Sequence, residues 1–255
     1  MELGLAGHRA MVCGASRGIG AAIAETLAQE GVRVALVARS AEALLVRSEQ
    51  IGGVPVVADL STREGPATAV SAAANALSGL DLLVVNSGGP PKGWFTELSE
   101  EQWQLAVDGT LLAAIRLIGA ALPWLRGGRD AAILVVLSSS VREPIDGLDT
   151  SNVLRPGLAS LVKSLAVQLA PIRVNGLLPG KVLTDRVAQL DAERAASQEV
   201  EVATARREAV ARIPLGRYGL PVELGRVATF LCSPAASYVS GVNLAVDGGM
   251  IRSVP

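Results

Sequence analysis

The chain has 255 residues, 50% of them hydrophobic, which is enough to bury one large core. Its 23 basic and 24 acidic residues give a formal net charge of −1 and no basic face. This balance argues against nucleic acid and acidic membrane surfaces as partners, so we expect a small-molecule partner. Nothing in the composition marks a second domain, and we expect a single domain over residues 1–255.

The N-terminal sequence MELGLAGHRAMV lacks a charged segment followed by an apolar one, and no unbroken run of about 18 apolar residues occurs. We therefore expect a soluble, cytoplasmic protein. Cys13 and Cys232 lie in apolar runs far apart in the sequence, without the spacing of a metal site, and we interpret both as buried thiols. His8 is the only histidine, so we expect neither a histidine-based triad nor a metal site.

Short apolar runs rich in Val, Leu and Ile alternate with longer amphipathic stretches. Continuous apolar strands separated by helices favour a parallel sheet that is covered on both faces. The sequence therefore predicts an α/β fold with a doubly wound sheet. The expected strands lie within 9–15, 32–39, 54–59, 80–88, 131–140, 172–180 and 242–249, and helices within 23–31, 41–52 and 67–79 follow the first three.

The charged stretch from Asp185 to Arg212 has a helical composition. It follows a strand end, which is where ligands bind in such sheets. Two interpretations stay open: a solvated surface helix, or a lid-like helical segment at about 182–213 that covers a cleft.

The sequence CGASRGIG, residues 13–20, lies between the first expected strand and the first helix. Gly14, Gly18 and Gly20 have the spacing G-x-x-x-G-x-G, which permits a tight turn, close approach of the backbone to a pyrophosphate and close helix packing. A lone glycine pattern is weak, but the strand before it and the helix after it supply the structural context. These residues predict a dinucleotide site.

The end of the second expected strand indicates which dinucleotide is preferred. An NAD enzyme usually has an Asp or Glu there for the ribose 2′-hydroxyl, whereas this sequence has Arg39. Arg17, inside the glycine turn, is a second cation close by. Two guanidinium groups suit a 2′-phosphate, so we predict NADP as the cofactor, with NAD less favoured.

The glycine turn and several further motifs resemble the short-chain dehydrogenase/reductase family over essentially the whole length, and are similar to its acyl-carrier-protein reductase branch. VVNSGG stands where the family has Asn-Asn-Ala-Gly, RVNGLLPGKVLT contains its Pro-Gly-x-x-x-Thr, and IPLGRYGLPVELG and SYVSGVNLAVDGG match its C-terminal motifs. The resemblance implies a Rossmann-type fold, a nicotinamide cofactor, oxidoreductase activity on a carbonyl or hydroxyl substrate, and usually a homotetramer. The apolar stretches 103–122 and 158–170 agree with an oligomer.

The glycine turn and the resemblance together identify a set of candidate cofactor-binding residues. Asp59 and Leu60 stand at the adenine-contacting position of the family. The full set is Gly14, Ser16, Arg17, Gly18, Ile19, Gly20, Arg39, Asp59, Leu60, Asn86, Gly88, Pro179, Gly180, Val182 and Thr184.

The same resemblance implies a catalytic tetrad of Asn, Ser, Tyr and Lys, and we count each position in this sequence. Ser138 stands at the substrate-polarising serine, although the run SSS leaves Ser139 and Ser140 as other registers. The position of the Tyr is occupied by Ser151 and that of the Lys by Arg155. The Asn position is Thr110.

These replacements change the chemistry. The tyrosine of the family donates a proton because the neighbouring lysine lowers the pKa of its phenol, and a serine hydroxyl is too weak an acid for that task. Arg155 keeps the positive charge and can hydrogen-bond a ribose, but it cannot be deprotonated and so cannot relay protons. We keep Ser138, Ser151 and Arg155 as the candidate catalytic residues.

Pro156 raises a local objection to a helix that runs through residues 151–155. Proline disfavours the α conformation of the residue before it and lacks an amide donor. A helix that starts with Ser151 or Asn152 as its N-cap would place Pro156 near the first turn, where the loss is smallest.

Other residues could donate the proton. Glu143, Asp146 and Asp149 lie in the loop VREPIDGLD, which lines the substrate pocket in the family, although solvated loop charges are the commoner case. Tyr218 and Tyr238 are the only tyrosines, and both lie in motifs that resemble structural parts of the family.

Three functions remain open. The first is an NADP-dependent oxidoreductase with an unusual proton donor, and the second is a nucleotide-binding family member with little or no redox activity. The third is a dehalogenase of the same fold, which we rank last because such enzymes resemble this chain in having Arg for Lys but keep the Tyr and lose the glycines.

Overall fold

The computed structural model describes residues 2–253. Its centre is a seven-stranded sheet in which all neighbouring strands are parallel, in the order β3-β2-β1-β4-β5-β6-β7. The strands are β1 (Arg9–Cys13), β2 (Arg33–Ala38), β3 (Val54–Val57), β4 (Leu82–Val85), β5 (Ala132–Val136), β6 (Arg173–Pro179) and β7 (Asn243–Val246).

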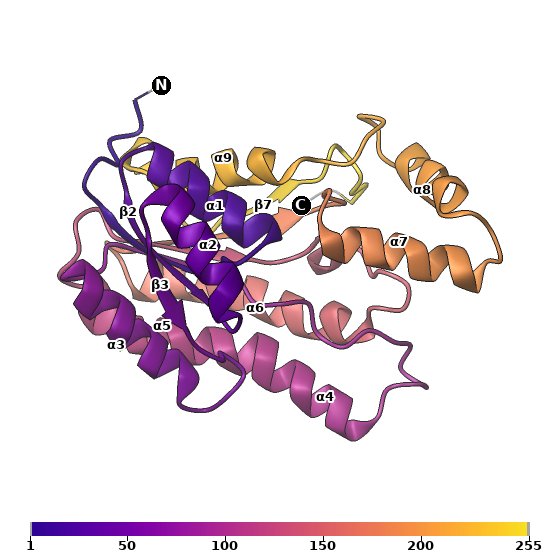
Figure 1. Cartoon of the computed structure of the whole chain (residues 1–255), viewed down its shortest axis with the longest axis horizontal. Helices are drawn as coiled ribbons and strands as arrows, with labels where there is room; N and C mark the ends of the chain where they lie inside the picture. The colour runs from indigo at the N-terminus through magenta and orange to yellow at the C-terminus, as the bar shows by residue number, and fades with distance from the viewer. Residues whose placement is uncertain (1, 254–255) are drawn as a thin grey trace.

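Helices cover both faces of the sheet, as Figure 1 shows. The α-helices are α1 (Gly18–Gln29), α2 (Ala41–Ile51), α3 (Gly65–Leu77), α4 (Glu100–Ala106), α5 (Ala113–Leu125), α6 (Asp149–Gln168), α7 (Asp185–Ser197), α8 (Val202–Ala211) and α9 (Pro221–Cys232). Short turns are η1 (Val107–Leu112, a π-helix) and the 3₁₀ turns η2 (Ser139–Val141) and η3 (Pro234–Ala236).

Each face of the sheet carries its own cluster of buried apolar side chains. Alternate residues of β1 show the division, because Met11 and Cys13 join the cluster beneath α3, α5 and α6, whereas Ala10 and Val12 join the one beneath α1 and α9. Side chains of a strand alternate between faces, so each strand of a doubly covered sheet must be apolar on both. The predicted α/β, Rossmann-type doubly wound fold is confirmed.

The carboxyl edge of the sheet holds the position where a dinucleotide binds in such folds. β1 has β2 on one side and β4 on the other. Strands β2 and β3 are added to the sheet on one side of β1, and strands β4 to β7 on its other side, so the strand order reverses between β1 and β4. A reversal of strand order leaves a crevice at the carboxyl ends of the two strands. The glycine turn after β1 and the loop after β4 therefore line the same crevice.

The segment α4–η1–α5, Glu100–Leu125, is long and apolar enough to cross a membrane by length and composition alone. Its inner side, including Leu117, Ile118 and Ala121, packs into the core beside α3. It is therefore a core helix of this fold.

Cys13 and Cys232 are both buried and unpaired, as expected. Burial raises the pKa of each thiol to about 12. Neither thiol is a nucleophile at neutral pH, because only the thiolate reacts.

Candidate functional site

The glycine turn and the loop after β4 pack against each other without room for side chains. Gly14 has φ +61°, and a Cβ added to it would lie 2.6 Å from Nδ2 of Asn86. A Cβ on Gly20 would lie 2.2 Å from the carbonyl oxygen of Gly14. Nδ2 of Asn86 donates a hydrogen bond to the Cys13 carbonyl over 3.1 Å. Three residues expected at the cofactor are thus brought together, and each glycine has a steric reason.

The Pro-Gly-x-x-x-Thr stretch joins the same edge from β6. A methyl carbon of Thr184 lies 3.5 Å from the position of a Cβ on Gly18, whose φ is +60°. Gly180 follows the last residue of β6, and a Cβ there would lie 2.6 Å from the Cα of Asp247. Val182 is buried against the core. The fold therefore places Thr184, the N-cap residue of α7, beside the glycine turn.

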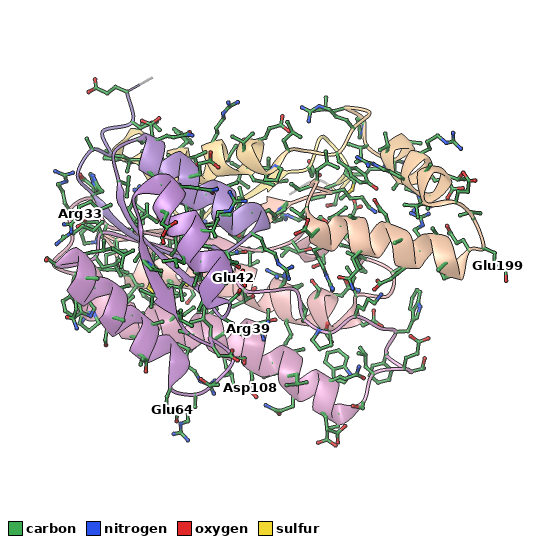
Figure 2. The ribbon with its side chains drawn as sticks, viewed as in Figure 1. Arg33, Arg39, Glu42, Glu64, Asp108 and Glu199 are labelled. Atoms are coloured by element: carbon green, nitrogen blue, oxygen red, sulfur yellow. The ribbon has the colours of Figure 1, made fainter. Side chains whose placement is uncertain are left out.

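The two arginines expected at a 2′-phosphate are both exposed. Arg17 is the N-cap residue of α1. Arg39 follows β2 at the carboxyl edge of the sheet, at the end of the strand away from Arg33 (Figure 2).

One carboxylate does lie near Arg39, although the strand end itself carries none. The pKa of Asp59 is lowered mainly by hydrogen bonds from the hydroxyl and amide of Ser61, with a smaller contribution from the charge of Arg39. Arg39 forms no hydrogen bond or ion pair with this carboxylate within residues 2–253, so its donors stay available.

The remaining cofactor candidates lie along the same edge. Gly88, in the loop after β4, is exposed, and three other candidates are half-buried. These half-buried candidates are Ser16, Ile19 and Leu60, with Pro179 buried at the end of β6.

The hydroxyls at the chemical end are bonded mainly to one another. Oγ of Ser138 accepts the amide of Ser140 over 3.1 Å and so caps the turn η2. Oγ of Ser140 lies 3.0 Å from Oγ of Ser151, and both side chains are buried. Ser151 therefore contacts Ser140, which the sequence offered only as another register, instead of Ser138.

Arg155 lies one helical turn beyond Ser151 and is only 6% exposed. Its Nη1 donates to the carbonyl oxygen of Val136, at the end of β5, over 2.7 Å. Desolvation lowers the pKa of Arg155 to about 10, and no carboxylate within residues 2–253 lies at ion-pair distance. The guanidinium is thus a buried cation beside the candidate site that is held by main-chain oxygen.

The expected start of α6 is wrong. The helix begins at Asp149 and continues through Pro156, so neither Ser151 nor Asn152 is its N-cap. The amide and carbonyl of Ile145 both bond the side chain of Asn152, at 2.9 and 3.0 Å, which fixes the preceding loop to the first turn. Packing of the apolar face of α6 outweighs the single hydrogen bond that Pro156 removes.

Thr110, at the expected Asn position, is 1% exposed and lies in the π-helical turn η1 that contacts α6. π-Turns inside α-helices occur frequently at functional sites. A π-turn thus surrounds the expected Asn position, where a threonine hydroxyl replaces the amide side chain.

Two of the three loop carboxylates already serve as acceptors for main-chain amides. Oε1 of Glu143 accepts the amides of Arg252 and Ser253 at 2.7 and 3.0 Å, and Oδ2 of Asp149 accepts the amide of Phe95 at 2.7 Å. Asp146 is exposed to solvent. Both amides occupy Oε1 of Glu143, so a proton on Oε2 would leave these contacts intact, whereas Asp149 also accepts Nδ2 of Asn152 on Oδ1 over 3.2 Å and has both oxygens bonded.

Neither tyrosine hydrogen-bonds the candidate catalytic residues Ser138, Ser151 and Arg155. Tyr238 is fully exposed, and the hydroxyl of Tyr218 donates to the buried carboxylate of Asp191 at 3.0 Å from each oxygen. Burial, followed by this carboxylate, raises the pKa of Tyr218. Tyr218 is therefore a structural residue.

Asp191 belongs to a polar cluster that the sequence did not single out. Nζ of Lys181, just after β6, lies 3.7 Å from Oδ1 of Asp191 on α7 and 5.7 Å from the centre of the Tyr218 ring. Burial lowers the pKa of Lys181, partly offset by the charge of Asp191. The cluster fixes α7 to the strand that carries the Pro-Gly stretch. A lone Asp within a helix of alternating charges gives no signal of burial, so only the fold reveals it.

The donors at the carboxyl edge suit a dinucleotide. Within residues 2–253 no group of three or more His, Cys, Asp or Glu side chains could hold a metal ion. The carboxyl edge instead offers a side-chain-free turn at Gly14 and Gly20, and exposed guanidinium groups at Arg17 and Arg39.

Comparison with known proteins agrees with this geometry. Residues 14–251 match the family model described as enoyl-(acyl-carrier-protein) reductase. The 3-oxoacyl-(acyl-carrier-protein) reductase FabG of Vibrio cholerae is 31% identical over 252 residues, covering 97% of this chain and 99% of that protein. The chain therefore belongs to the short-chain dehydrogenase/reductase family.

Two solved structures are informative. L-Sorbose reductase from Gluconobacter frateurii, in complex with NADPH and L-sorbose, superposes with a TM-score of 0.92 at 31% identity and full coverage of both chains. A short-chain oxidoreductase from Pseudomonas aeruginosa PAO1, described as containing an atypical catalytic center, superposes in its apo form with a TM-score of 0.88 at 30% identity, covering 98% of this chain and 100% of that one.

Proposed function

We propose that the chain is an NADP-preferring short-chain oxidoreductase that acts on a carbonyl or hydroxyl group of a small molecule with a proton donor other than tyrosine. The observation that carries the proposal is the exposed pair Arg17 and Arg39 at the carboxyl edge beside the glycine turn. The NADPH complex of the structurally similar L-sorbose reductase supports the same cofactor.

The residues of this chain would hold the cofactor in three places. The glycine turn and Thr184 would surround the pyrophosphate. Arg17 and Arg39 would bind the 2′-phosphate. Asn86 would line the crevice between these two groups. The cofactor would supply the hydride, which the protein alone cannot provide.

The groups around the reacting carbon have divided roles in this proposal. Ser138 would hydrogen-bond the substrate oxygen and orient it. Ser151 cannot replace a phenol, because its hydroxyl is a far weaker acid and already lies against Ser140. A water molecule or a carboxylate of the 143–149 loop would then deliver the proton. Arg155 would contribute fixed positive charge without transferring a proton.

A second candidate function is nucleotide binding with little or no redox activity. The specific observation in its favour is that Ser138, Ser140, Ser151 and Arg155 all have protein partners. The atypical catalytic center of the Pseudomonas aeruginosa relative shows that departures from the usual centre are found on this fold.

The wider organisation follows the family. We propose one dinucleotide-binding domain over residues 1–255, with α7 and α8 in the 182–213 segment acting as a lid; they form the orange end of the molecule in Figure 1. We further propose a cytoplasmic homotetramer.

Two measurements on the wild-type protein separate the functions: NADPH binding, and NADPH oxidation with a panel of ketones, β-ketoacyl thioesters and quinones. An oxidoreductase should turn over at least one class, and Ser138→Ala should reduce that rate while leaving NADPH affinity unchanged. Tight binding without turnover on any class would favour the nucleotide-binding function. Absence of NADPH and NADH binding would refute both.

A further inference from the structure

Arg186 lies on the first turn of α7, which is held against the glycine turn. Thr184 caps this helix by accepting the amide of Val187 over 3.3 Å. The methyl group of the same Thr184 lies against Gly18. The backbone that carries Arg186 is therefore fixed to one wall of the crevice.

The side chain of Arg186 reaches the opposite wall. Its Nε, Nη2 and Cζ lie 3.5, 3.6 and 3.8 Å from the position that a Cβ would take on Gly89, in the loop after β4. A methyl group at that position would be in ordinary van der Waals contact with the guanidinium, so the guanidinium faces the side-chain-free surface of this glycine. Arg186 thus spans from the glycine-turn wall of the crevice to its β4 wall.

The charge of Arg186 has no protein partner within residues 2–253. It forms neither a hydrogen bond nor an ion pair there, and it is exposed. A neighbouring contact between the same two elements differs, because Lys92 of the β4 loop pairs with Glu193 of α7. Two contacts therefore connect α7 to this loop. In one, Lys92 and Glu193 neutralise each other; in the other, the guanidinium of Arg186 lies near Gly89 with its hydrogen-bond donors free.

A free guanidinium that reaches across the crevice from the first turn of α7, beside the glycine turn, suits a doubly charged diphosphate. The α7 N-terminus and the glycine turn on the wall that carries Arg186 both present main-chain amides, and a guanidinium can donate two parallel hydrogen bonds to phosphate oxygens. A substrate carbonyl carries no comparable charge.

We propose that Arg186 binds the pyrophosphate of the dinucleotide and thereby fastens α7 over it. This inference rests on the proposed function, since it presupposes that the crevice binds a dinucleotide. It assigns a phosphate-binding role to a residue outside the glycine turn and outside the Pro-Gly-x-x-x-Thr stretch.

The test compares two ligands by calorimetric titration. NADPH contains both the pyrophosphate and the 2′-phosphate, whereas adenosine 2′-monophosphate keeps the 2′-phosphate but lacks the 5′-phosphate, and with it the whole pyrophosphate and the nicotinamide half. Arg186→Ala should weaken NADPH binding about 10- to 100-fold, the usual effect of losing a charged hydrogen bond, and leave the affinity for adenosine 2′-monophosphate unchanged. Arg186→Lys should retain part of the NADPH affinity, because the charge stays and the paired donors are lost.

Two control variants complete the design. Arg39→Ala should weaken both ligands, and Arg207→Ala, on the exposed side of α8, should weaken neither. Unchanged melting temperatures would show that the variants are folded. If wild type binds NADPH and Arg186→Ala binds it equally well, or if Arg186→Ala loses both ligands alike, the assignment of Arg186 is wrong while NADP binding stands. If wild type binds no dinucleotide, the proposed function fails, and this inference fails with it.

Discussion

Oγ of Ser151 lies 3.0 Å from Oγ of Ser140, and both side chains are buried. A serine side chain is several ångströms shorter than a tyrosine, so the hydroxyl at this position stays near the main chain of α6. The Ser151 hydroxyl therefore bonds Ser140 inside the protein. A group other than residue 151 must donate the proton that a tyrosine phenol would supply at this position.

The first prediction concerns restoration of the phenol. Wild type should reduce ordinary ketones about 10² to 10⁴ times more slowly than family members that have the tyrosine, because general acid catalysis is lost. Ser151→Tyr alone should help little, since Arg155 cannot relay a proton. The triple variant Ser151→Tyr, Arg155→Lys, Pro156→Ala should be faster, measured as NADPH turnover on one ketone panel.

The contributions within that triple variant can be separated. Because α6 already runs through Pro156, Pro156→Ala by itself should raise the melting temperature and leave turnover unchanged. Wild-type turnover at the rate of ordinary relatives would mean that another donor acts, and Glu143, Asp146 and Asp149 would be the next residues to replace.

The second prediction concerns the 2′-phosphate. Arg39→Ala should bring the affinities for NADPH and NADH closer together, because a charge-assisted bond to phosphate is lost while the rest of the site is kept. Asp59→Asn should strengthen NADPH binding slightly, since it removes the negative charge near Arg39. Fluorescence titration of both cofactors measures these effects, and a preference for NADPH that survives Arg39→Ala would contradict the assignment.

The third prediction concerns the polar cluster beneath α7. Asp191→Asn should lower the free energy of unfolding by about 1.5–3 kcal/mol, because the buried carboxylate that accepts from Tyr218 and pairs with Lys181 becomes a neutral amide and its charge-assisted interactions are lost. It should also speed proteolysis within residues 185–211. Glu208→Gln is the control, since its ion pair with Arg194 is largely exposed and should contribute less than about 1 kcal/mol. Equal proteolysis rates for both variants would show that the cluster does not hold this segment.

The fourth prediction is a pH dependence at the start of α9. Hydrogen bonds from Arg217, and then from the amide of Leu220, lower the pKa of Glu223 to about 2. A lowered carboxyl pKa stabilises the fold above the ordinary value and loses that contribution as the pH falls through about 2. Glu223→Gln should therefore melt slightly below wild type at pH 7, and the gap should close between pH 4.5 and 2. The effect is small because both side chains are partly solvated, and a gap of constant size would refute it.

The fifth prediction concerns assembly. Leu105, Val153 and Val167 are 62%, 60% and 76% exposed on α4 and α6, and Ile115 is 44% exposed on α5. Apolar groups gathered on helices in this way favour a subunit interface. Light scattering at micromolar concentration should show a tetramer, or at least a dimer, and Ile115→Glu with Val167→Glu should shift it to smaller species. Leu215→Glu, in a loop away from these helices, should not. A monomeric wild type would contradict the prediction.

The amino-acid sequence by itself determined the sheet and the cofactor edge. Strands that are buried on both faces must be continuously apolar, and Gly14, Gly18 and Gly20 stand close together in the chain, so both signals are local and can be counted. The position of Arg39 at a strand end is equally local.

The tertiary structure alone decided the chemistry around α6 and α7. Ser140 meets Ser151, Arg155 reaches the Val136 carbonyl and Lys181 approaches Asp191 because separate elements pack together. The start of α6 also depended on packing, because burial of its apolar face stabilises the helix by more than the hydrogen bond that Pro156 removes. The choice of a partner by a polar side chain depends on which groups the whole fold leaves unsatisfied nearby, and no spacing along the chain records that.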